Sequence, residues 1–261
     1  MPTQLIVTTS HKARPETIRR AHEFAAAHQY DFVPRGDDSV EDLLGSTDAA
    51  LVVANGGVIR IATAHGSLAA HLGTGYIRLK SLSRGDGDPL VRAGEIGSGD
   101  HVVDTTFGLG RDAIVAACAA GPNGQITAIE SSDALFHLGQ HGLTDGPLSP
   151  SEVAKVGDHL LAAPIQLVHG EAMAWLRAAE ANSADVVLID PMFDSPRSSD
   201  KGFELLRSLA DASPLTADWV AEARRVARRW VVIKTGTAPA WFTNSGVQRV
   251  HSHSNATWWR V

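Results

Sequence analysis

Short apolar runs recur at regular intervals from residue 99 to the end of the chain. Helix-like segments separate five runs that are rich in valine and isoleucine: 101–105, 125–130, 165–169, 185–190 and 230–234. Continuous apolar strands that alternate with helices are typical of a parallel sheet covered on both faces. The pattern therefore predicts a doubly wound α/β domain over residues 99–261.

The end of this domain follows a different pattern. Two further strand-like runs, 247–252 and 256–261, are separated only by a tight turn at Ser254 and Asn255. Strands joined this closely have to be antiparallel, because parallel strands need a long crossover connection. The predicted sheet is thus seven-stranded and mostly parallel, and it carries an antiparallel C-terminal hairpin.

A small α/β lobe is predicted over residues 1–65. Residues 5–7 form a short buried-strand run, and Pro15 can open the helix that follows. Asn55-Gly56-Gly57 lies between two apolar runs, which indicates a hairpin. The lobe is expected to pack a few strands and at least one helix.

Residues 66–98 are expected to form a connector with at most one strand. Glycine, serine and histidine are frequent there, and Arg78, Lys80 and Arg84 lie among apolar residues. The chain as a whole has a formal net charge of −6, so it has no overall basic field that would attract nucleic acid. The three basic residues are therefore the best candidates for a local basic patch.

Composition excludes several classes of protein. Of the 261 residues, 44% are hydrophobic and 20% are charged, which is close to the globular average and unlike disordered, collagenous or coiled-coil chains. No apolar run is long enough to cross a bilayer and the N-terminus lacks a secretory signal, so we expect a cytoplasmic protein without membrane contact.

We also expect no metal: His137 and His141 lie one helical turn apart without a suitably spaced third ligand, and solvent-facing side chains explain them better.

The most informative motif follows the first strand of the large domain. Residues 104–113 read Asp-Thr-Thr-Phe-Gly-Leu-Gly-Arg-Asp-Ala and run into a helix. A strand, a glycine turn at Gly108 and Gly110 and a helix N-terminus form a nucleotide-binding corner, where the backbone can approach a ligand. Glu130 ends the next strand about 20 residues later, where its carboxylate can accept ribose hydroxyls. These features fit a dinucleotide oxidoreductase as well as other nucleotide enzymes.

Asp104 favours a cationic ligand over a dinucleotide. Asp104 lies at the strand end, where its carboxylate would repel a pyrophosphate but attract an ammonium group. S-adenosylmethionine carries such an ammonium, together with a ribose and an adenine. The adenine would lie beyond the third strand, where Glu171 follows. Ligands of open α/β sheets bind at these carboxyl ends.

A second motif, Asp190-Pro191-Met192-Phe193, follows the fourth strand. Pro191 ends the strand because it lacks a backbone donor, so the Asp190 carboxylate can point into the cleft as an acceptor. Phe193 offers a flat face to a planar base. The motif indicates a planar amine substrate, with Asp190, Pro191 and Phe193 as catalytic residues. A simple turn with Phe193 in the core is the alternative.

Together, the motifs resemble those of class I S-adenosylmethionine-dependent methyltransferases over about residues 76–261. Within that class they are similar to the bacterial group that methylates the exocyclic amine of a guanine in small-subunit ribosomal RNA. The N-terminal lobe is more similar to an uncharacterised bacterial branch of the same class. The resemblance implies ribosomal RNA or the small ribosomal subunit as partner. It also implies cofactor contacts along the motifs: Arg111 and Asp112 beside the methionine part, Glu130 and Ser131 beside the ribose, Glu171 near the adenine, and Asp190 where cofactor and amine meet.

Two other functions remain open at this point. One is an NAD-type Rossmann oxidoreductase, and the other is a non-catalytic RNA-binding or assembly protein. Lys234, after the fifth strand of the domain, is also open to two interpretations: a contact to RNA or a cap of the strand.

Overall fold

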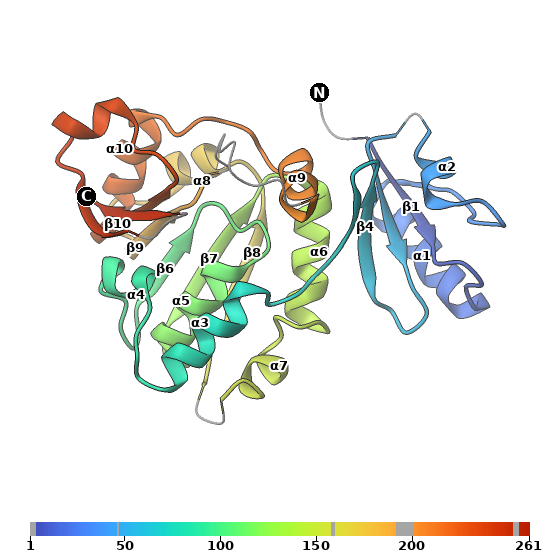
Figure 1. Ribbon diagram of the computed structural model, residues 1–261, viewed down its shortest axis with the longest axis horizontal. Helices are drawn as coiled ribbons and strands as arrows, with labels where there is room; N and C mark the ends of the chain where they lie inside the picture. Colours follow the sequence, from blue (N-terminus) through green and yellow to red (C-terminus); the bar gives the residue numbers. More distant parts are fainter. Residues whose placement is uncertain (1–3, 46, 158–159, 192–200, 253–255) are drawn as a thin grey trace.

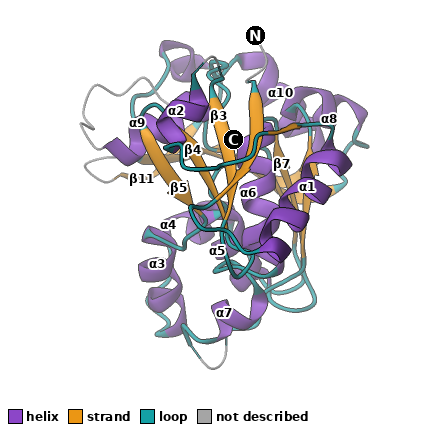
Figure 2. Cartoon of the chain, turned by 90° about the vertical axis from the view of Figure 1, so that its right-hand side faces the viewer, coloured by secondary structure: helices purple, strands orange, loops and turns teal. Residues whose placement is uncertain are grey.

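The computed structural model describes residues 4–45, 47–157, 160–191, 201–252 and 256–261. The chain forms two sheets with their covering helices (Figure 1). The smaller sheet has the strand order β2-β1-β3-β4-β5, and the larger has the order β11-β12-β10-β9-β6-β7-β8. Figure 2 shows the same arrangement from the side of the smaller sheet.

The N-terminal lobe contains the smaller sheet. Its strands are β1 (Leu5–Thr9), β2 (Asp31–Phe32), β3 (Ala49–Val53), β4 (Ile59–Thr63) and β5 (Gly66–Ala69), and its helices are α1 (Pro15–His28) and α2 (Val40–Leu44). Proline occupies the first turn of α1, and β3 and β4 form the predicted hairpin. β5 pairs antiparallel with β4, so this sheet extends to Ala69, beyond the expected limit at residue 65.

The segment after β5 is helical, whereas the expected connector contained one possible strand and no helix. It forms α3 (Thr74–Ser83) and α4 (Pro89–Gly94). The Asp88 side chain caps α4 by accepting a hydrogen bond of 2.9 Å from the backbone N–H of Leu90. Leu79 of α3 is fully buried. These helices pack on α5 and therefore belong to the large domain.

The larger sheet confirms the predicted architecture. Its strands are β6 (His101–Asp104), β7 (Gln125–Glu130), β8 (Ile165–His169), β9 (Ala184–Ile189), β10 (Ala227–Thr235), β11 (Gln248–Ser252) and β12 (Thr257–Arg260). Its other helices are α5 (Arg111–Ala120), α6 (Asp133–Thr144), α7 (Pro150–Ala154), α8 (Ala172–Ala178), α9 (Lys201–Leu209), α10 (Ala217–Val226) and the 3-10 helix η1 (Ala240–Asn244).

The topology of this sheet determines where a ligand can bind. β10, β9, β6, β7 and β8 are parallel, whereas β12 runs antiparallel to both β10 and β11. The predicted turn at Ser254 and Asn255 lies outside the described residues. From β6 the chain builds outward through β7 and β8, and it then returns to add β9 on the other side of β6. In an open α/β sheet, such a switch point leaves a crevice at the carboxyl ends of the strands.

The two lobes share one hydrophobic cluster. Leu51 and Val53 of the smaller sheet lie in the same cluster as Leu135 and Leu138 of α6 and Leu205 of α9. In Figure 1, α6 stands between the two sheets. The N-terminal lobe is therefore packed against the large domain through its apolar face.

His137 of α6 lies in this interface, which corrects the expectation of a solvent-facing histidine. The residue is 4% exposed, and its Nε2 lies 3.0 Å from the hydroxyl oxygen of Tyr30. Burial lowers the pKa of His137 to about 4. The imidazole is therefore neutral at physiological pH and packs as part of the core.

Candidate active site

A cleft opens at the carboxyl ends of β6, β7, β8 and β9, at the switch point of the sheet. Its cavity volume is about 80 Å³, and the space is continuous with solvent. Five residues of the predicted site line it: Gly108, Glu130, Ser131, Asp190 and Pro191. The predicted residues Asp104, Gly110, Arg111, Asp112 and Glu171 are not among the lining residues.

Glu130 is held at the end of β7 by the backbone around it. Its Oε2 accepts a hydrogen bond of 2.8 Å from Gly108 N–H, and its Oε1 accepts one of 2.8 Å from Ser132 N–H. Burial raises the pKa of this carboxyl, although the backbone donors counteract the rise. Each carboxylate oxygen can accept two hydrogen bonds, so Glu130 retains acceptor capacity toward the hydroxyl groups of a ligand.

The two glycines of the turn serve different purposes. Both have left-handed φ values, +54° at Gly108 and +71° at Gly110. A Cβ atom on Gly108 would have its nearest neighbour, the Thr106 carbonyl oxygen, at 3.9 Å, whereas one on Gly110 would lie 2.7 Å from the ring of Phe107. Gly108 thus leaves room for a ligand beside the backbone. Gly110 is required by internal packing.

Asp104 lies behind the cleft at the end of β6 and is 1% exposed. Its Oδ1 accepts a hydrogen bond of 3.0 Å from Thr106 N–H, but its buried Oδ2 accepts none from the residues that the structure describes. Burial raises the pKa of Asp104 to about 7, and the nearby carboxylates of Asp112 and Asp190 add to the rise. An incoming positive charge would stabilise its ionised form.

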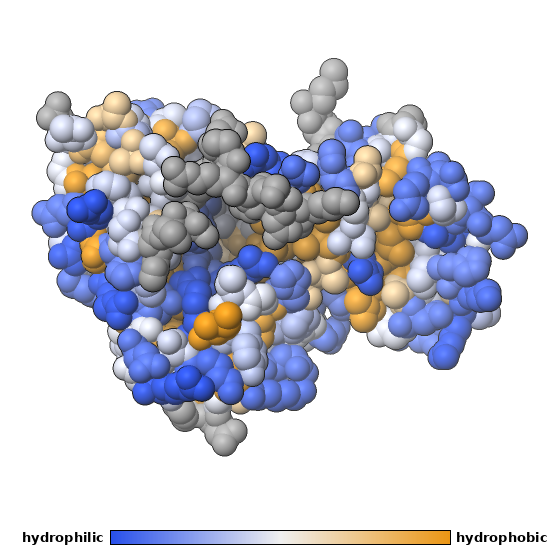
Figure 3. All heavy atoms as spheres, viewed as in Figure 1, coloured by the Kyte–Doolittle hydropathy of each residue, from blue (hydrophilic) through white to orange (hydrophobic). Residues whose placement is uncertain are grey.

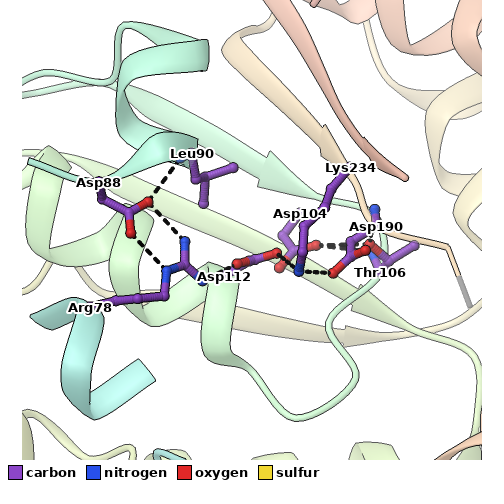
Figure 4. A network of polar contacts seen from close by, with 8 residues as sticks. All are labelled: Arg78, Asp88, Leu90, Asp104, Thr106, Asp112, Asp190 and Lys234. Carbon is purple, nitrogen blue, oxygen red and sulfur yellow. Dashed lines mark hydrogen bonds and ion pairs between the residues drawn. The ribbon is translucent and has the colours of Figure 1, made fainter. Parts of the chain in front are cut away.

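A chain of ion pairs connects α4 with the cleft (Figure 4). Asp88 holds Arg78 through two hydrogen bonds of 2.8 and 2.9 Å, and Arg78 also binds Asp112. Lys234 Nζ lies 3.2 Å from Asp112 Oδ2 and also binds Asp190 Oδ2. The backbone N–H of Asp190 donates to Thr106 Oγ1 at 2.8 Å. Asp190 is thus fixed through both its backbone and its side chain.

The chain of ion pairs sets the ionisation of its members. Burial alone would raise the pKa of Asp112, but Lys234 and Arg78 hold it far below its usual range. Burial raises the pKa of Asp190 to about 6, with Lys234 opposing the rise and Asp112 adding to it. Burial would lower the pKa of Lys234, yet Asp112 and Asp190 raise it. Lys234 is therefore fully charged at neutral pH.

Several predicted roles change in this arrangement. The Arg78 side chain is 18% exposed and bound by two carboxylates, so it does not belong to a surface basic patch. Lys234 binds two carboxylates, those of Asp112 and Asp190. The carboxylate of Asp112 is neutralised by those two cations.

The remaining predicted residues lie at or beyond the margin of the site. Arg111 lies against Gly73, where an added Cβ would be 2.8 Å from Arg111 Nη2. Glu171 is exposed at the N-cap of α8, next to the lining residue Gly170. Phe193 lies outside the described residues, so its expected place against a base stays a prediction.

Two residues that shape the cleft carry no signal that the sequence alone reveals. Thr106 lies inside the first motif, but its role becomes visible only in the hydrogen bond that it accepts from Asp190, which is 84 residues away in the sequence. Trp219 of α10 lines the cleft from the other side and is 7% exposed. Its position in the apolar pattern of the helix is like that of any aromatic residue in a core, so the local sequence does not identify Trp219 as a residue of the cleft.

The described residues contain no group of three or more His, Cys, Asp or Glu side chains that could hold a metal ion. Among the helices of the described part of the chain, none combines the length and the apolar character that crossing a bilayer requires.

Comparison with known proteins gives a consistent result. Residues 59–256 match a family model described as "Putative SAM-dependent methyltransferase". The chain is 32% identical over 230 residues to the uncharacterized protein YpiP of Bacillus subtilis (strain 168), covering 88% of each chain. It is 34% identical over 190 residues to ribosomal RNA small subunit methyltransferase J of Laribacter hongkongensis (strain HLHK9), covering 67% of this chain and 64% of that one.

Solved structures resemble the chain more distantly. A crystal structure of a SAM-dependent methyltransferase from Aquifex aeolicus aligns with a TM-score of 0.39 and 12% sequence identity, over 70% of this chain and 98% of that one.

Proposed function

The chain belongs to this family of S-adenosylmethionine-dependent methyltransferases, and we propose that it methylates an exocyclic amine nitrogen, that of a guanine in small-subunit ribosomal RNA. The observation that carries the proposal is the Asp190 carboxylate. It lines the same cleft as Glu130 and is followed directly by Pro191, which also lines it. Family membership decides against an NAD-type oxidoreductase.

The residues of the cleft fit the cofactor. When bound, S-adenosylmethionine supplies an electrophilic methyl group on a sulfonium. Glu130 retains acceptor capacity toward ribose hydroxyls, and Gly108 leaves space for the ligand beside the backbone. The partnerless Oδ2 of Asp104 lies close enough to Asp112 and Asp190 to be affected by their charges, so a cation near this group would be stabilised.

Asp190 would act on the amine. The lone pair of an aromatic amine is delocalised into its ring, so the nitrogen becomes nucleophilic as it turns pyramidal. A carboxylate that accepts an amine N–H favours this geometry and stabilises the positive charge that develops on nitrogen. Lys234 occupies Oδ2 of Asp190, which leaves Oδ1 as the oxygen for the substrate.

Two observations support an RNA substrate. The first is the similarity to proteins named ribosomal RNA small subunit methyltransferase J. The second is the outward face of α3, where Tyr76 and Ile77 are 46% and 69% exposed and Lys80 Nζ lies 5.8 Å from the centre of the Tyr76 ring. Figure 3 shows an apolar spot over α3 with hydrophilic residues around it. Exposed aromatic rings beside cations bind single-stranded nucleic acid by stacking and charge.

The decisive experiment uses the intact protein with labelled S-adenosylmethionine and small ribosomal subunits from a strain that lacks this gene. We expect label in RNA and, by nucleoside mass analysis, on a guanine amine. Asp190→Ala should lower turnover far more than the affinity for S-adenosylhomocysteine, because its interaction forms mainly in the transition state. If the Asp190→Ala variant supported subunit assembly as well as the wild-type protein does, the protein would instead be a non-catalytic RNA-binding protein.

The α3 face is tested separately. Lys80→Ala combined with Arg84→Ala should weaken RNA binding and reduce the slope of log affinity against log salt by about one for each phosphate that the variant no longer neutralises. Arg19→Ala is the matched control, because Arg19 is an exposed cation on α1 of the other lobe. An equal effect of the control would show that the α3 face is not the RNA-binding surface.

A further inference from the structure

The ion-pair chain that ends at Asp190 alternates in sign and is built from distant parts of the sequence. Its members are Asp88 before α4, Arg78 of α3, Asp112 of α5, Lys234 of β10 and Asp190 after β9. The exposed fraction of the side chains is 1% at Asp88 and 28% at Asp190. Only Asp190 lines the cleft, so the chain runs from the protein interior to the site.

Stability alone is a weak reason for such a chain. Removing charges from water is costly, and buried ion pairs often stabilise a fold no better than apolar residues of similar volume. What a well-bonded chain does provide is orientation. Arg78 is held at two atoms by Asp88, Asp112 is held between Arg78 and Lys234, and Lys234 is held between two carboxylates. Each side chain therefore has little freedom to rotate.

We propose that Lys234 is a positioning residue for methyl transfer, which orients the Asp190 carboxylate and keeps it ionised, and that Asp112, Arg78 and Asp88 hold Lys234 in place. The inference rests on the role proposed for Asp190. Lys234 binds Oδ2, so Oδ1, which accepts no hydrogen bond from the described residues, keeps a defined direction toward the amine. Helices α3 and α4 thereby support the reacting group although neither supplies a residue that lines the cleft.

The charges around Asp190 explain why Lys234 is needed. Asp112 of α5 and Asp104 of β6 are both buried carboxylates on its side of the sheet, and Asp104 already interacts with it. Arg78 is bound to Asp112 and Asp88. Lys234 is therefore the cation in direct contact with Asp190 among the described residues. Without it, burial and the neighbouring carboxylates would favour a protonated Asp190, which is a poorer acceptor than the carboxylate.

The test replaces Lys234 by a neutral residue of similar length. Lys234→Met should lower kcat at least tenfold, leave the affinity for S-adenosylhomocysteine within threefold, and move the acidic limb of the kcat profile to higher pH by about one unit or more. Arg229→Met is the matched control: Arg229 lies on the same strand and pairs with Asp100, away from the cleft. Its profile should keep the wild-type limb.

A second variant guards against misfolding. Asp112→Asn with Lys234→Met removes one charge of each sign and leaves the Arg78–Asp88 pair intact, and it should shift the acidic limb in the same direction. A loss of turnover without any shift, or a loss equal to that of Arg229→Met, would mean that Lys234 is merely structural and would overturn the inference.

A titration separates this inference from the proposed function. The carboxyl carbon of Asp190, labelled with ¹³C and assigned with Asp190→Asn, can be followed by NMR against pH without any substrate. Its pKa should be higher in Lys234→Met than in the wild-type protein, and an unchanged value would overturn the inference. Failure of the wild-type enzyme to methylate RNA would overturn the substrate proposal and leave this result standing.

Discussion

Replacement of Asp104 by asparagine is expected to stabilise the ligand-free protein in a strongly pH-dependent way. The amide oxygen of Asp104→Asn can keep the hydrogen bond from Thr106 N–H, which is 3.0 Å long in the wild-type protein. The change replaces the ionisable oxygen Oδ2, which is buried and accepts no hydrogen bond from the described residues, by an amide nitrogen that does not titrate. The pH dependence of the comparison therefore reports the free energy of holding a carboxylate at this position.

The magnitude follows from the pKa. Burial raises the pKa of Asp104 from 3.8 to about 7, and each pKa unit corresponds to about 1.4 kcal/mol. Between these values the folded protein retains a proton that the unfolded chain has released, so its stability falls as the pH rises through this window. Asparagine does not titrate. The stability difference between variant and wild type should thus increase by about 4 kcal/mol, in favour of the variant, from pH 4 to pH 8.

Denaturant unfolding of both proteins at pH 4, 6 and 8 measures this difference directly. Asp190 also titrates in the window, and its charge adds to the raised pKa of Asp104, so the measured difference includes the interaction between the two carboxyls. A difference that stays constant from pH 4 to pH 8 would refute the reasoning, because it would show that Asp104 ionises normally in the fold.

The proposed contact between Asp104 and the ammonium of the cofactor adds a second measurement. Ligand binding should favour the ionised carboxylate, so the affinity of the wild-type protein for S-adenosylhomocysteine should rise between pH 6 and pH 8. The affinity of Asp104→Asn should be lower and show a smaller pH dependence. Calorimetry would contradict the contact if the two proteins bound the ligand equally well at pH 8. A more stable protein with weaker binding would mark Asp104 as a ligand-binding residue.

Three further predictions follow from the cleft and the lobe interface. Gly110→Ala should destabilise the fold more than Gly108→Ala does, because the new Cβ at position 110 would lie 2.7 Å from a phenylalanine ring. Gly108→Ala should lower the free energy of unfolding by about 1–2 kcal/mol in denaturant unfolding and should also weaken binding of S-adenosylhomocysteine. Glu130→Gln should lower that affinity at least tenfold by calorimetry, since a charge-assisted hydrogen bond contributes about 1.5–3 kcal/mol, and a change below twofold would argue against the ribose contact. Tyr30→Phe should destabilise the protein by about 1 kcal/mol in thermal unfolding without affecting ligand binding, because it removes one buried hydrogen bond between the lobes.

The sequence predicted the larger sheet well because its strands are buried on both faces. β9 lies between β10 and β6 and is covered by helices, so valine, leucine and isoleucine occupy consecutive positions from Val186 to Ile189. A continuous apolar run of this kind can be recognised without knowledge of its neighbours. The glycine turn and the acidic residues at the strand ends could be predicted from the same alternation of strands and helices, because the topology places the carboxyl ends of the parallel strands at one edge of the sheet.

The region of α3 was predicted poorly for an equally physical reason. Leu79 is the largest fully buried side chain of α3, while Tyr76 and Ile77 are exposed. The positions of the apolar residues therefore do not indicate which side of this helix faces the core. Arg78 binds Asp112, from which it is separated by 34 positions in the sequence, and Lys234 binds Asp190 over a separation of 44 positions. Nothing local distinguishes a cation that will be buried by such partners from one that will stay in solvent.

The shared cluster around α6 makes the two lobes one cooperative unit. A fragment that began after β5 would leave Leu135, Leu138 and Leu205 without the sheet that covers them, and exposed apolar surface of this kind promotes aggregation. α6 also begins immediately after Ser132, whose N–H holds Glu130. Slow amide hydrogen exchange at the start of α6 should therefore depend on the folding of the N-terminal lobe, and removing that lobe should loosen the side of the cleft that Glu130 lines.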